Sequence, residues 1–366
     1  MKSTGKLKQE RVLTAIVGSY PKPKYISPTT GRKLIDSTGF LFDEYERKIG
    51  KRNFKLLLNK ATKEAIEDQN AAGIDFISDG EERRSQYVMH VLKGLGGIDF
   101  KKVKRVITRG GIYQRDVPTI VNKISYKKPI TVSDFAFTKR HTKAVVKVNL
   151  PGPSTVVDSL ADEYYKGNLQ NIAFDYAEAI HHEVEALIKE GCRVIQFDDP
   201  VLLRYPDRAK AWGLKALEKC FEGFEDQATY VVHICRGYPN KPLEKKGISY
   251  KANKDYYRDI LSWLSKSKLD AVSIEGAQSK LDLSILPAIG KKTVMLGVLD
   301  VGINTVETVG SLVKRTNEAL QYIPKEQLIL APDCGMVEIT RTAAYKKLKN
   351  LAKAAQKINR RMENAW

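Results

Sequence analysis

Four side chains with metal-binding chemistry stand near the ends of three apolar runs of the sequence. His233 and Cys235 end one run, Glu275 ends the next, and Cys334 ends the last. Residues i and i+2 of a β-strand point to the same side, so the imidazole of His233 and the thiol of Cys235 can face one point. Imidazole, thiolate and carboxylate are all zinc ligands. The pattern therefore predicts a four-ligand Zn²⁺ site.

The same residues also have a plainer interpretation. A lone His-x-Cys pair is often coincidental, and a buried cysteine often serves as a small hydrophobic side chain. The occurrence of Glu275 and Cys334 at matching strand ends favours the metal site. A site rich in cysteine suits a metal that binds another sulfur, because soft ligands favour zinc–thiolate chemistry.

The elements that must position these residues are eight short runs rich in branched and aromatic side chains, each bounded by Gly, Pro or Asp. Most are almost continuously apolar, which is typical of parallel strands buried on both faces. The eight runs are Leu13–Tyr20, Ile74–Gly80, Val146–Pro153, Arg193–Pro200, Thr229–Gly237, Ala271–Ala277, Thr293–Asp300 and Leu328–Gly335.

Segments of helical period separate most of these runs. In residues 173–190, for example, Tyr176, Ile180, Val184 and Leu187 recur every three or four positions. Eight strands that alternate with helices predict an α/β fold, a single (β/α)8 TIM barrel whose chemistry lies at the carboxyl ends of its strands. A doubly wound open sheet is the competing architecture, and the count of eight disfavours it.

One stretch, residues 95–145, falls outside the alternation of strands and helices. It contains strand-like pieces at Val103–Thr108, Thr119–Ile124 and Ile130–Val132. We interpret it as a β-rich insertion after the second strand and its helix. The sequence has no internal repeat or Gly/Ser-rich linker, so residues 1–366 are expected to form one catalytic barrel with this insertion inside it.

Composition and charge narrow the classes of protein. The chain is 42% hydrophobic and 29% charged, which is typical of a folded globular protein. It has no apolar run of the roughly 20 residues that cross a bilayer, and no apolar segment follows its basic N-terminus. A cytoplasmic protein without a membrane partner is therefore expected, and its four cysteines argue against a disulfide framework.

The net charge of +19 could attract polyanions. The basic residues are spread in short pieces such as Lys101-Lys102 and Lys291-Lys292, with no long basic block. A solvated Lys-rich surface is therefore favoured over a nucleic-acid site. The patterns predict no particular oligomeric state.

Several separated motifs of this chain resemble one known family, and their order along the chain agrees with it. From Leu13 to about Arg341 the sequence resembles the catalytic half of cobalamin-independent methionine synthase and its single-barrel relatives. The motifs that carry the resemblance are Val17-Gly18-Ser19-Tyr20-Pro21, Gly80-Glu81 with Arg83-Arg84, Pro151-Gly152-Pro153, Gln196-Phe197-Asp198-Asp199-Pro200, His233-Ile234-Cys235, Ser273-Ile274-Glu275 and Pro332-Asp333-Cys334-Gly335.

The resemblance implies zinc-dependent transfer of a methyl group to the thiol of homocysteine, with methionine as the product. It also implies that Ser19, with nearby backbone such as that of Gly18, holds the substrate carboxylate. Glu81 and Asp198 would take the ammonium group, which gives two acids for one cation. Asp199 is expected to cap a helix instead.

The sequence departs from the family pattern where the methyl donor would bind. Ser159 stands near the position of a Trp that stacks on folate, and Gly302 replaces a His that could protonate the leaving nitrogen. Asp300 is a nearby acid, so Asp198 and Asp300 are the candidate catalytic residues. An amine leaves poorly unless it is protonated, whereas a methyl-corrinoid donor needs no proton. Methylfolate and methyl-corrinoid donors therefore both stay open.

Two other functions compete with methionine formation. A related zinc alkyltransferase could act on another thiol, such as coenzyme M, and open an epoxide. Alternatively, the barrel could keep a structural zinc and serve as a non-catalytic binding subunit. The presence of Ser19, Glu81 and Asp198 argues against the second alternative, because a structural zinc site needs no amino-acid pocket.

Overall fold

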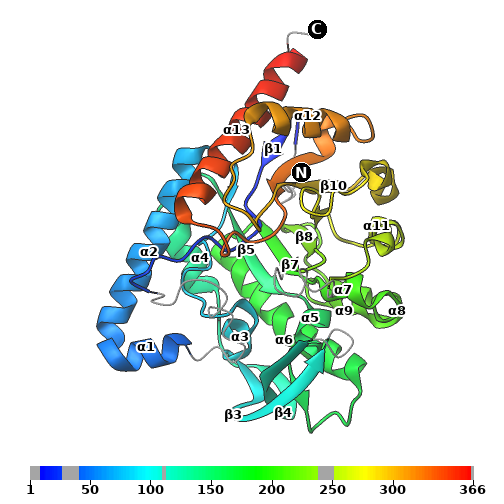
Figure 1. The fold of residues 1–366 in the computed structure, drawn as a ribbon. Helices are drawn as coiled ribbons and strands as arrows, with labels where there is room; N and C mark the ends of the chain where they lie inside the picture. Colours follow the sequence, from blue (N-terminus) through cyan, green and yellow to red (C-terminus); the bar gives the residue numbers. More distant parts are fainter. Residues whose placement is uncertain (1–8, 27–40, 109–112, 238–250, 364–366) are drawn as a thin grey trace.

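A computed structural model of the chain describes residues 9–26, 41–108, 113–237 and 251–363. Its main sheet has eight parallel strands in the order β1-β11-β10-β9-β8-β7-β5-β2 (Figure 1). The eight strands are β1 (Leu13–Thr14), β2 (Phe76–Ile77), β5 (Val145–Pro151), β7 (Val194–Asp198), β8 (Thr229–Ile234), β9 (Ala271–Ile274), β10 (Thr293–Leu299) and β11 (Leu328–Pro332).

The two outer strands of this sheet meet and close it into a barrel. Ala15, directly after β1, forms a parallel bridge with Phe76 of β2. The backbone N–H of Ile16 donates to the carbonyl of Phe76 at 3.1 Å. Each of the eight predicted runs contains one of the eight strands or overlaps it, so the predicted barrel is confirmed.

Helices surround the barrel, as the alternation in the sequence predicts. The longest lie on its outside, with α2 and α13 side by side (Figure 1). None of the helices in the described part of the chain is both long enough and apolar enough to cross a membrane. The α-helices are α1 (Leu41–Ile49), α2 (Lys51–Ala72), α3 (Tyr87–Leu92), α4 (Val132–Lys139), α5 (Pro153–Val157), α6 (Leu169–Glu190), α7 (Val201–Arg204), α8 (Pro206–Arg208), α9 (Leu214–Lys219), α11 (Tyr257–Ser265), α12 (Val309–Ala319) and α13 (Arg341–Glu363).

Two long antiparallel strands, β3 (Leu95–Thr108) and β4 (Tyr113–Tyr126), form the β-rich part of the predicted insertion. They lie at one edge of the molecule (Figure 1), where β6 (Ala161–Asp162) pairs with β4. The strand expected at 130–132 is wrong, because Val132 begins α4. The buried carboxylate of Glu183 accepts the backbone N–H groups of Ile130 and Thr131, at 2.9 and 2.6 Å. These β-branched residues therefore lead into a helix.

The interior of the barrel changes from apolar to polar along the strands. Alternate residues of a strand share a face, so an interior position recurs every second residue. On β7, apolar Val194 is followed on that face by Gln196 and Asp198, and on β8 apolar Val231 is followed by His233. The polar groups therefore gather at the carboxyl ends of the strands, where barrel chemistry is expected.

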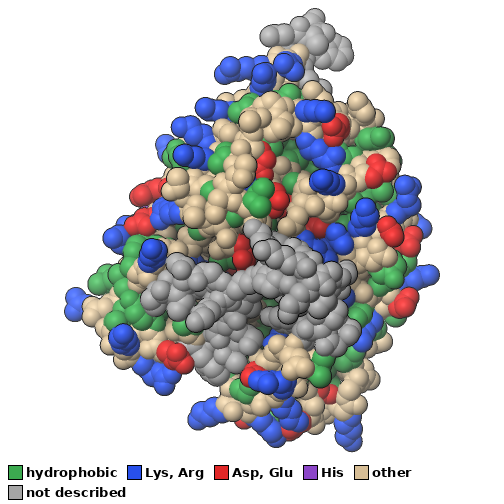
Figure 2. Space-filling view, in the orientation of Figure 1, with side chains coloured by type: hydrophobic (Ala, Val, Ile, Leu, Met, Phe, Trp, Pro, Cys, Tyr) green, Lys and Arg blue, Asp and Glu red, His purple; other side chains and the backbone are tan. Residues whose placement is uncertain are grey.

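The positive charge of the chain is distributed over its surface. Figure 2 shows Lys and Arg side chains scattered across one face, and the described residues of this face form no continuous basic stripe. Several of these side chains pair with acids, as Lys102 and Lys104 do with Glu163.

Candidate metal centre and adjoining acidic pocket

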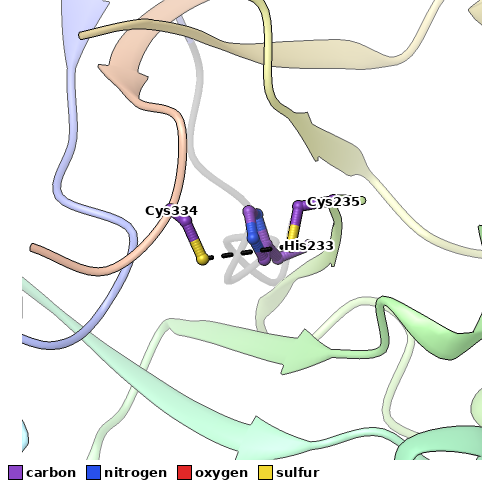
Figure 3. Close-up of side chains that lie close together, drawn as sticks. All are labelled: His233, Cys235 and Cys334. Atoms are coloured by element: carbon purple, nitrogen blue, oxygen red, sulfur yellow. Dashed lines mark hydrogen bonds between the residues drawn. The ribbon is translucent and has the colours of Figure 1, made fainter. Parts of the chain in front are cut away.

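Three of the four expected metal ligands meet at the carboxyl ends of their strands. His233 lies on β8, Cys235 directly follows that strand, and Cys334 follows β11. Their ligand atoms lie within 4.8 Å of one another, and the two Sγ atoms are 3.9 Å apart. Figure 3 shows these three side chains turned toward a common point.

The imidazole of His233 is oriented by a neighbouring strand. Its Nδ1 lies 2.9 Å from the hydroxyl of Ser273, which is the register partner of His233 on β9. Its Nε2 is buried without a hydrogen-bond partner among the described residues. One ring nitrogen is therefore fixed, and the other is left for a ligand.

Glu275, the fourth expected ligand, lies outside the group of three. It follows β9 and is 2% exposed. One carboxylate oxygen accepts the backbone N–H of Arg236 at 3.3 Å, whereas Oε1 is buried without a partner among the described residues. Burial, together with the negative charges of Cys235 and Asp333, raises the pKa of Glu275 to about 8.

The electrostatics of the group favour a thiolate beside an imidazole. A hydrogen bond with Cys334 and the positive charge of His233 outweigh burial and hold the pKa of the Cys235 thiol well below its usual range. Burial disfavours the charged imidazole, but the negative charge of Cys235 raises the pKa of His233 overall. Cys192 and Cys220 differ, because burial raises the pKa of both thiols.

This set of donors fits a zinc ion. Two sulfurs that each lie about 2.3 Å from tetrahedral zinc would be about 3.8 Å apart, close to the 3.9 Å between Cys235 and Cys334. The unpartnered Nε2 of His233 supplies a nitrogen ligand. The unpartnered Oε1 of Glu275 is the atom available for the expected oxygen ligand, although Glu275 does not belong to the group of three.

Asp333 fixes the loop next to Glu275. Its carboxylate accepts the backbone N–H groups of Gly276, Ala277 and Gln278, at 2.9, 2.8 and 2.6 Å. A Cβ atom at Gly297 of β10 would lie 2.4 Å from Oδ1 of Asp333. The glycine therefore allows the loops after β9 and β11 to meet across β10, next to the metal group.

Two buried acids, Asp198 and Glu81, lie next to the metal group, and we refer to these two residues as the acidic pocket. Asp198, at the end of β7, is the register partner of His233. Glu81 approaches Asp198 from the side of Gly18, where a Cβ atom would also lie 2.9 Å from the amide nitrogen of Asn149, which donates to Asp198 at 3.1 Å. A Cβ atom at Gly18 would lie only 2.6 Å from Oε1 of Glu81. Gly18 therefore leaves room for the Glu81 carboxylate in the pocket.

Glu81 occupies an unusual backbone conformation. Its φ of 53° lies in the left-handed region, as does the φ of 68° of the preceding Gly80. A residue with a side chain adopts this conformation at a cost of about 1–3 kcal/mol, and such strain is concentrated at functional sites. The N–H of Glu81 donates to the Asp79 carboxylate at 2.9 Å, which holds the turn. Burial is the main cause that raises the pKa of Glu81 to about 7.

Ser19 and Asp199 were also singled out in the sequence, and the structure gives each of them hydrogen-bond partners. The carbonyl of Ser19 accepts the N–H of Met336, two residues beyond Cys334, at 2.8 Å, so Ser19 lies at the same end of the barrel. Asp199 accepts the N–H groups of Ser154 and Thr155 in the first turn of α5, as expected of a helix cap.

Asp300 follows β10, and its side chain belongs to a turn. Its Oδ1 accepts the N–H of Gly302 at 2.7 Å. Its own N–H donates to Glu307, and its carbonyl accepts the fully buried ammonium group of Lys347. The turn that carries Asp300 is therefore firmly held.

A buried polar network below the pocket was not predicted. Lys147, Asn149 and Gln196 point into the barrel and contact Asp198 or one another. The alternation of polar residues in Lys147-x-Asn149 and Gln196-x-Asp198, within runs that are otherwise apolar, was the available signal.

Comparison with known proteins assigns a family. Residues 12–357 match the family model described as the catalytic domain of cobalamin-independent synthase. The methionine synthase of Pyrococcus horikoshii is 28% identical over 352 residues, which cover 96% of this chain and 94% of that protein. The methionine synthase of Saccharolobus solfataricus is 28% identical over 353 residues, with 96% of each chain covered.

A solved structure agrees with these relatives. The B12-independent methionine synthase from Shewanella sp. W3-18-1, solved in complex with selenomethionine, superimposes with a TM-score of 0.85 at 29% identity. The similarity covers 97% of this chain and 100% of that one.

Proposed function

The chain belongs to the family of cobalamin-independent synthase catalytic domains, and from this we propose that it is a zinc-dependent methyltransferase that forms methionine from homocysteine. The methionine synthases to which it is similar are covered almost completely by the match. The proposed ligands are His233, Cys235, Glu275 and Cys334.

The observation that carries the proposal is the register between Asp198 and His233 on adjacent strands. It places an acid suited to an ammonium group one strand away from a group of thiol and imidazole ligands. An amino acid with a thiol at the end of its side chain can span such a pair of sites. A purely structural metal site would not need an acid that binds an ammonium group.

Zinc, when bound, would keep the substrate sulfur ionised at neutral pH, where a free thiol with a pKa near 8.5 is mostly protonated. Ser273 would hold the His233 ring through Nδ1, so that Nε2 faces the ligand position. Glu81 and Asp198 would bind the substrate ammonium, and Gly18 and Ser19 would receive the carboxylate. These contacts would fix the thiol of the substrate beside the Cys235 and Cys334 sulfurs.

The charges of the pocket favour homocysteine over coenzyme M. Coenzyme M carries a sulfonate and no ammonium group, so Glu81 and Asp198 would repel it. Arg236, the nearest candidate partner for a sulfonate in the sequence, donates to the carbonyl of Ala252 at 2.6 Å instead.

For a methylfolate donor, Asp300 is the acid we propose for protonation of the leaving nitrogen. A methyl-corrinoid donor would need no such proton. The deciding experiment supplies homocysteine or coenzyme M together with methylfolate, methylcobalamin or an epoxide. We expect methionine from homocysteine with at least one methyl donor. Thioether formation only from coenzyme M and the epoxide would contradict the proposal, and so would zinc-loaded protein that is inactive with every pair.

The affinity for homocysteine should depend on pH through Glu81. Its pKa is raised to about 7, so the carboxyl becomes neutral below that pH and stops attracting the ammonium group. We expect the KM for homocysteine to rise as the pH falls below about 7, by at most tenfold per pH unit. In Glu81→Gln this dependence should disappear. The substrate thiol titrates equally with both proteins, so its contribution cancels when the KM of wild type is divided by the KM of Glu81→Gln at each pH. Parallel profiles for the two proteins would contradict the role of Glu81.

Removal of the hydroxyl that orients His233 should weaken the metal site without abolishing it. Loss of such an orienting partner typically lowers metal affinity about 10- to 100-fold. We therefore expect Ser273→Ala to release zinc to a chelator at 10- to 100-fold lower chelator concentration than wild type. Ser284 donates its N–H and its hydroxyl to the carboxylate of Asp282, which caps the turn there, so it offers a matched control, and Ser284→Ala should bind zinc normally. Unchanged zinc affinity in Ser273→Ala would refute the role of this hydroxyl.

A further inference from the structure

A fully enclosed lysine lies inside the barrel below the acidic pocket. Lys147, on β5, is 2% exposed. Its ammonium group donates to three acceptors, which are the carbonyl of Val17, Oδ1 of Asn149 at 3.0 Å and Oε1 of Gln196 at 2.7 Å. An ammonium group has three protons and no acceptor, so its hydrogen-bonding capacity is filled.

The side-chain amides of Asn149 and Gln196 connect Lys147 to Asp198 through hydrogen bonds. The amide nitrogen of Asn149 donates to Asp198 at 3.1 Å and to the carbonyl of Val17 at 2.7 Å. The amide nitrogen of Gln196 donates to Asp198 at 2.6 Å and to the same carbonyl at 3.0 Å. All four amide protons therefore have acceptors.

Lys147 allows only one orientation of both amides. If either amide turned over, its NH₂ group would face the ammonium of Lys147, and its oxygen would face the carboxylate of Asp198. Both contacts would be repulsive, and buried polar groups without partners are destabilising. Lys147 therefore fixes which atoms of the two amides face Asp198.

We propose that Lys147 is a positioning residue that sets the specificity of the enzyme for thiols carrying an α-ammonium group. It acts through Asn149 and Gln196, whose NH₂ groups hold Asp198 as an acceptor with a fixed orientation. The inference rests on the proposed function, because it assigns Asp198 to the ammonium group.

The charge of Lys147 supports the same role. Burial lowers the pKa of its ammonium group to about 8, and the negative charges of Asp198 and Glu81 oppose that shift. Lys147 is therefore mostly charged at neutral pH and offsets part of the negative charge above it. Without this cation, Asp198 and Glu81 would lose a nearby positive charge, and their ionised forms would be less stable.

The test measures binding of two thiols to cobalt-substituted protein, through the thiolate-to-cobalt absorption band, so it needs no methyl donor. The thiols are homocysteine and 4-mercaptobutyrate, which differ only by the amino group. We expect wild type to prefer homocysteine by roughly 10- to 100-fold, the value of one charged hydrogen bond. In Lys147→Met this preference should fall below about fivefold through weaker homocysteine binding, with 4-mercaptobutyrate affinity changed less than about threefold.

Three further variants separate this role from a general effect on folding. Gln196→Met should reduce the preference in the same direction, and Lys147→Met/Gln196→Met should be no worse than Lys147→Met, because both act through one path. Lys292→Met removes a lysine that donates to the carbonyls of Ser267 and Leu269 at the other end of the strands, and it should keep the wild-type preference.

The outcomes separate the two proposals. A wild-type preference near one would overturn both the proposed function and the role of Lys147. A clear wild-type preference that persists in Lys147→Met would overturn the role of Lys147 alone. If Lys147→Met does not fold, Gln196→Met decides the question, and a preference unchanged in that variant also overturns the inference.

Discussion

Cys235→Ser is expected to lose its zinc and its methyltransferase activity together. Structural zinc sites with four ligands bind with about 10–16 kcal/mol, so one ligand contributes roughly 2.5–4 kcal/mol. That corresponds to a 10²- to 10³-fold loss of zinc affinity. Serine presents a much more weakly acidic and harder donor than the thiolate that Cys235 forms beside His233 and Cys334. The variant should therefore retain almost no zinc after dialysis against a moderate chelator.

Zinc content and turnover should be measured on the same preparations. Cys220→Ala is the matched control, because Cys220 is equally buried but bonds only to the carbonyl of Ala216 in the outer core. It should keep one zinc per chain and its activity. Turnover by metal-free wild type, or normal zinc retention by Cys235→Ser, would overturn the assignment of the metal site.

The barrel could be predicted from the sequence because its interior strands are buried on both faces. Runs such as 193–200 and 293–300 are almost continuously apolar and alternate with amphipathic helices. The insertion was harder to predict. Ile130, Thr131 and Val132 have high strand propensity, but the Glu183 carboxylate accepts the N–H groups of the first two and starts a helix there. That carboxylate is more than fifty residues away, so local propensity could not indicate it.

The meeting of three candidate metal ligands could be predicted because they stand at strand ends, where the barrel topology alone brings them together. His233, Cys235 and Cys334 need only the strand order to meet. The position of Glu275 depends on the loop that Asp333 pins, and a loop conformation does not follow from strand order. This explains why three of the four candidate ligands are grouped and Glu275 is not among them.

The polar network around Lys147 could not be predicted from the sequence pattern of its strand. A charged residue in an apolar run looks like an exposed position or an irregularity in the strand. Here it is tolerated because three acceptors from three strands or their ends surround it, and two of those acceptors are side chains. Only the closed barrel brings Val17, Asn149 and Gln196 to one point. The polar floor of the pocket is therefore a property of the closed sheet rather than of any single strand.

Asp198→Asn should lower kcat/KM for homocysteine about 10²- to 10⁴-fold. The change removes the negative charge that would bind the ammonium group, worth roughly 1.5–3 kcal/mol. It also replaces one acceptor oxygen of residue 198 with an NH₂ donor. Gln196 donates to Oδ1 of Asp198 at 2.6 Å and Asn149 donates to Oδ2 at 3.1 Å, so the NH₂ group of the new amide would either meet one of these NH₂ groups or displace it and face the substrate ammonium. Two donors would then meet, which costs a further 1–3 kcal/mol or so.

The loss should be specific to the amino group of the substrate. Binding of 4-mercaptobutyrate to cobalt-substituted Asp198→Asn should stay within about threefold of wild type, and zinc content should be unchanged, because Asp198 neighbours His233 without being a ligand. Asp199→Asn is the matched control. Its carboxylate caps α5 through Ser154 and Thr155, so this variant should lower the melting temperature and leave the preference for homocysteine intact. Equal losses for both thiols in Asp198→Asn would mean that Asp198 supports the metal group, and its assignment to the substrate ammonium would fail.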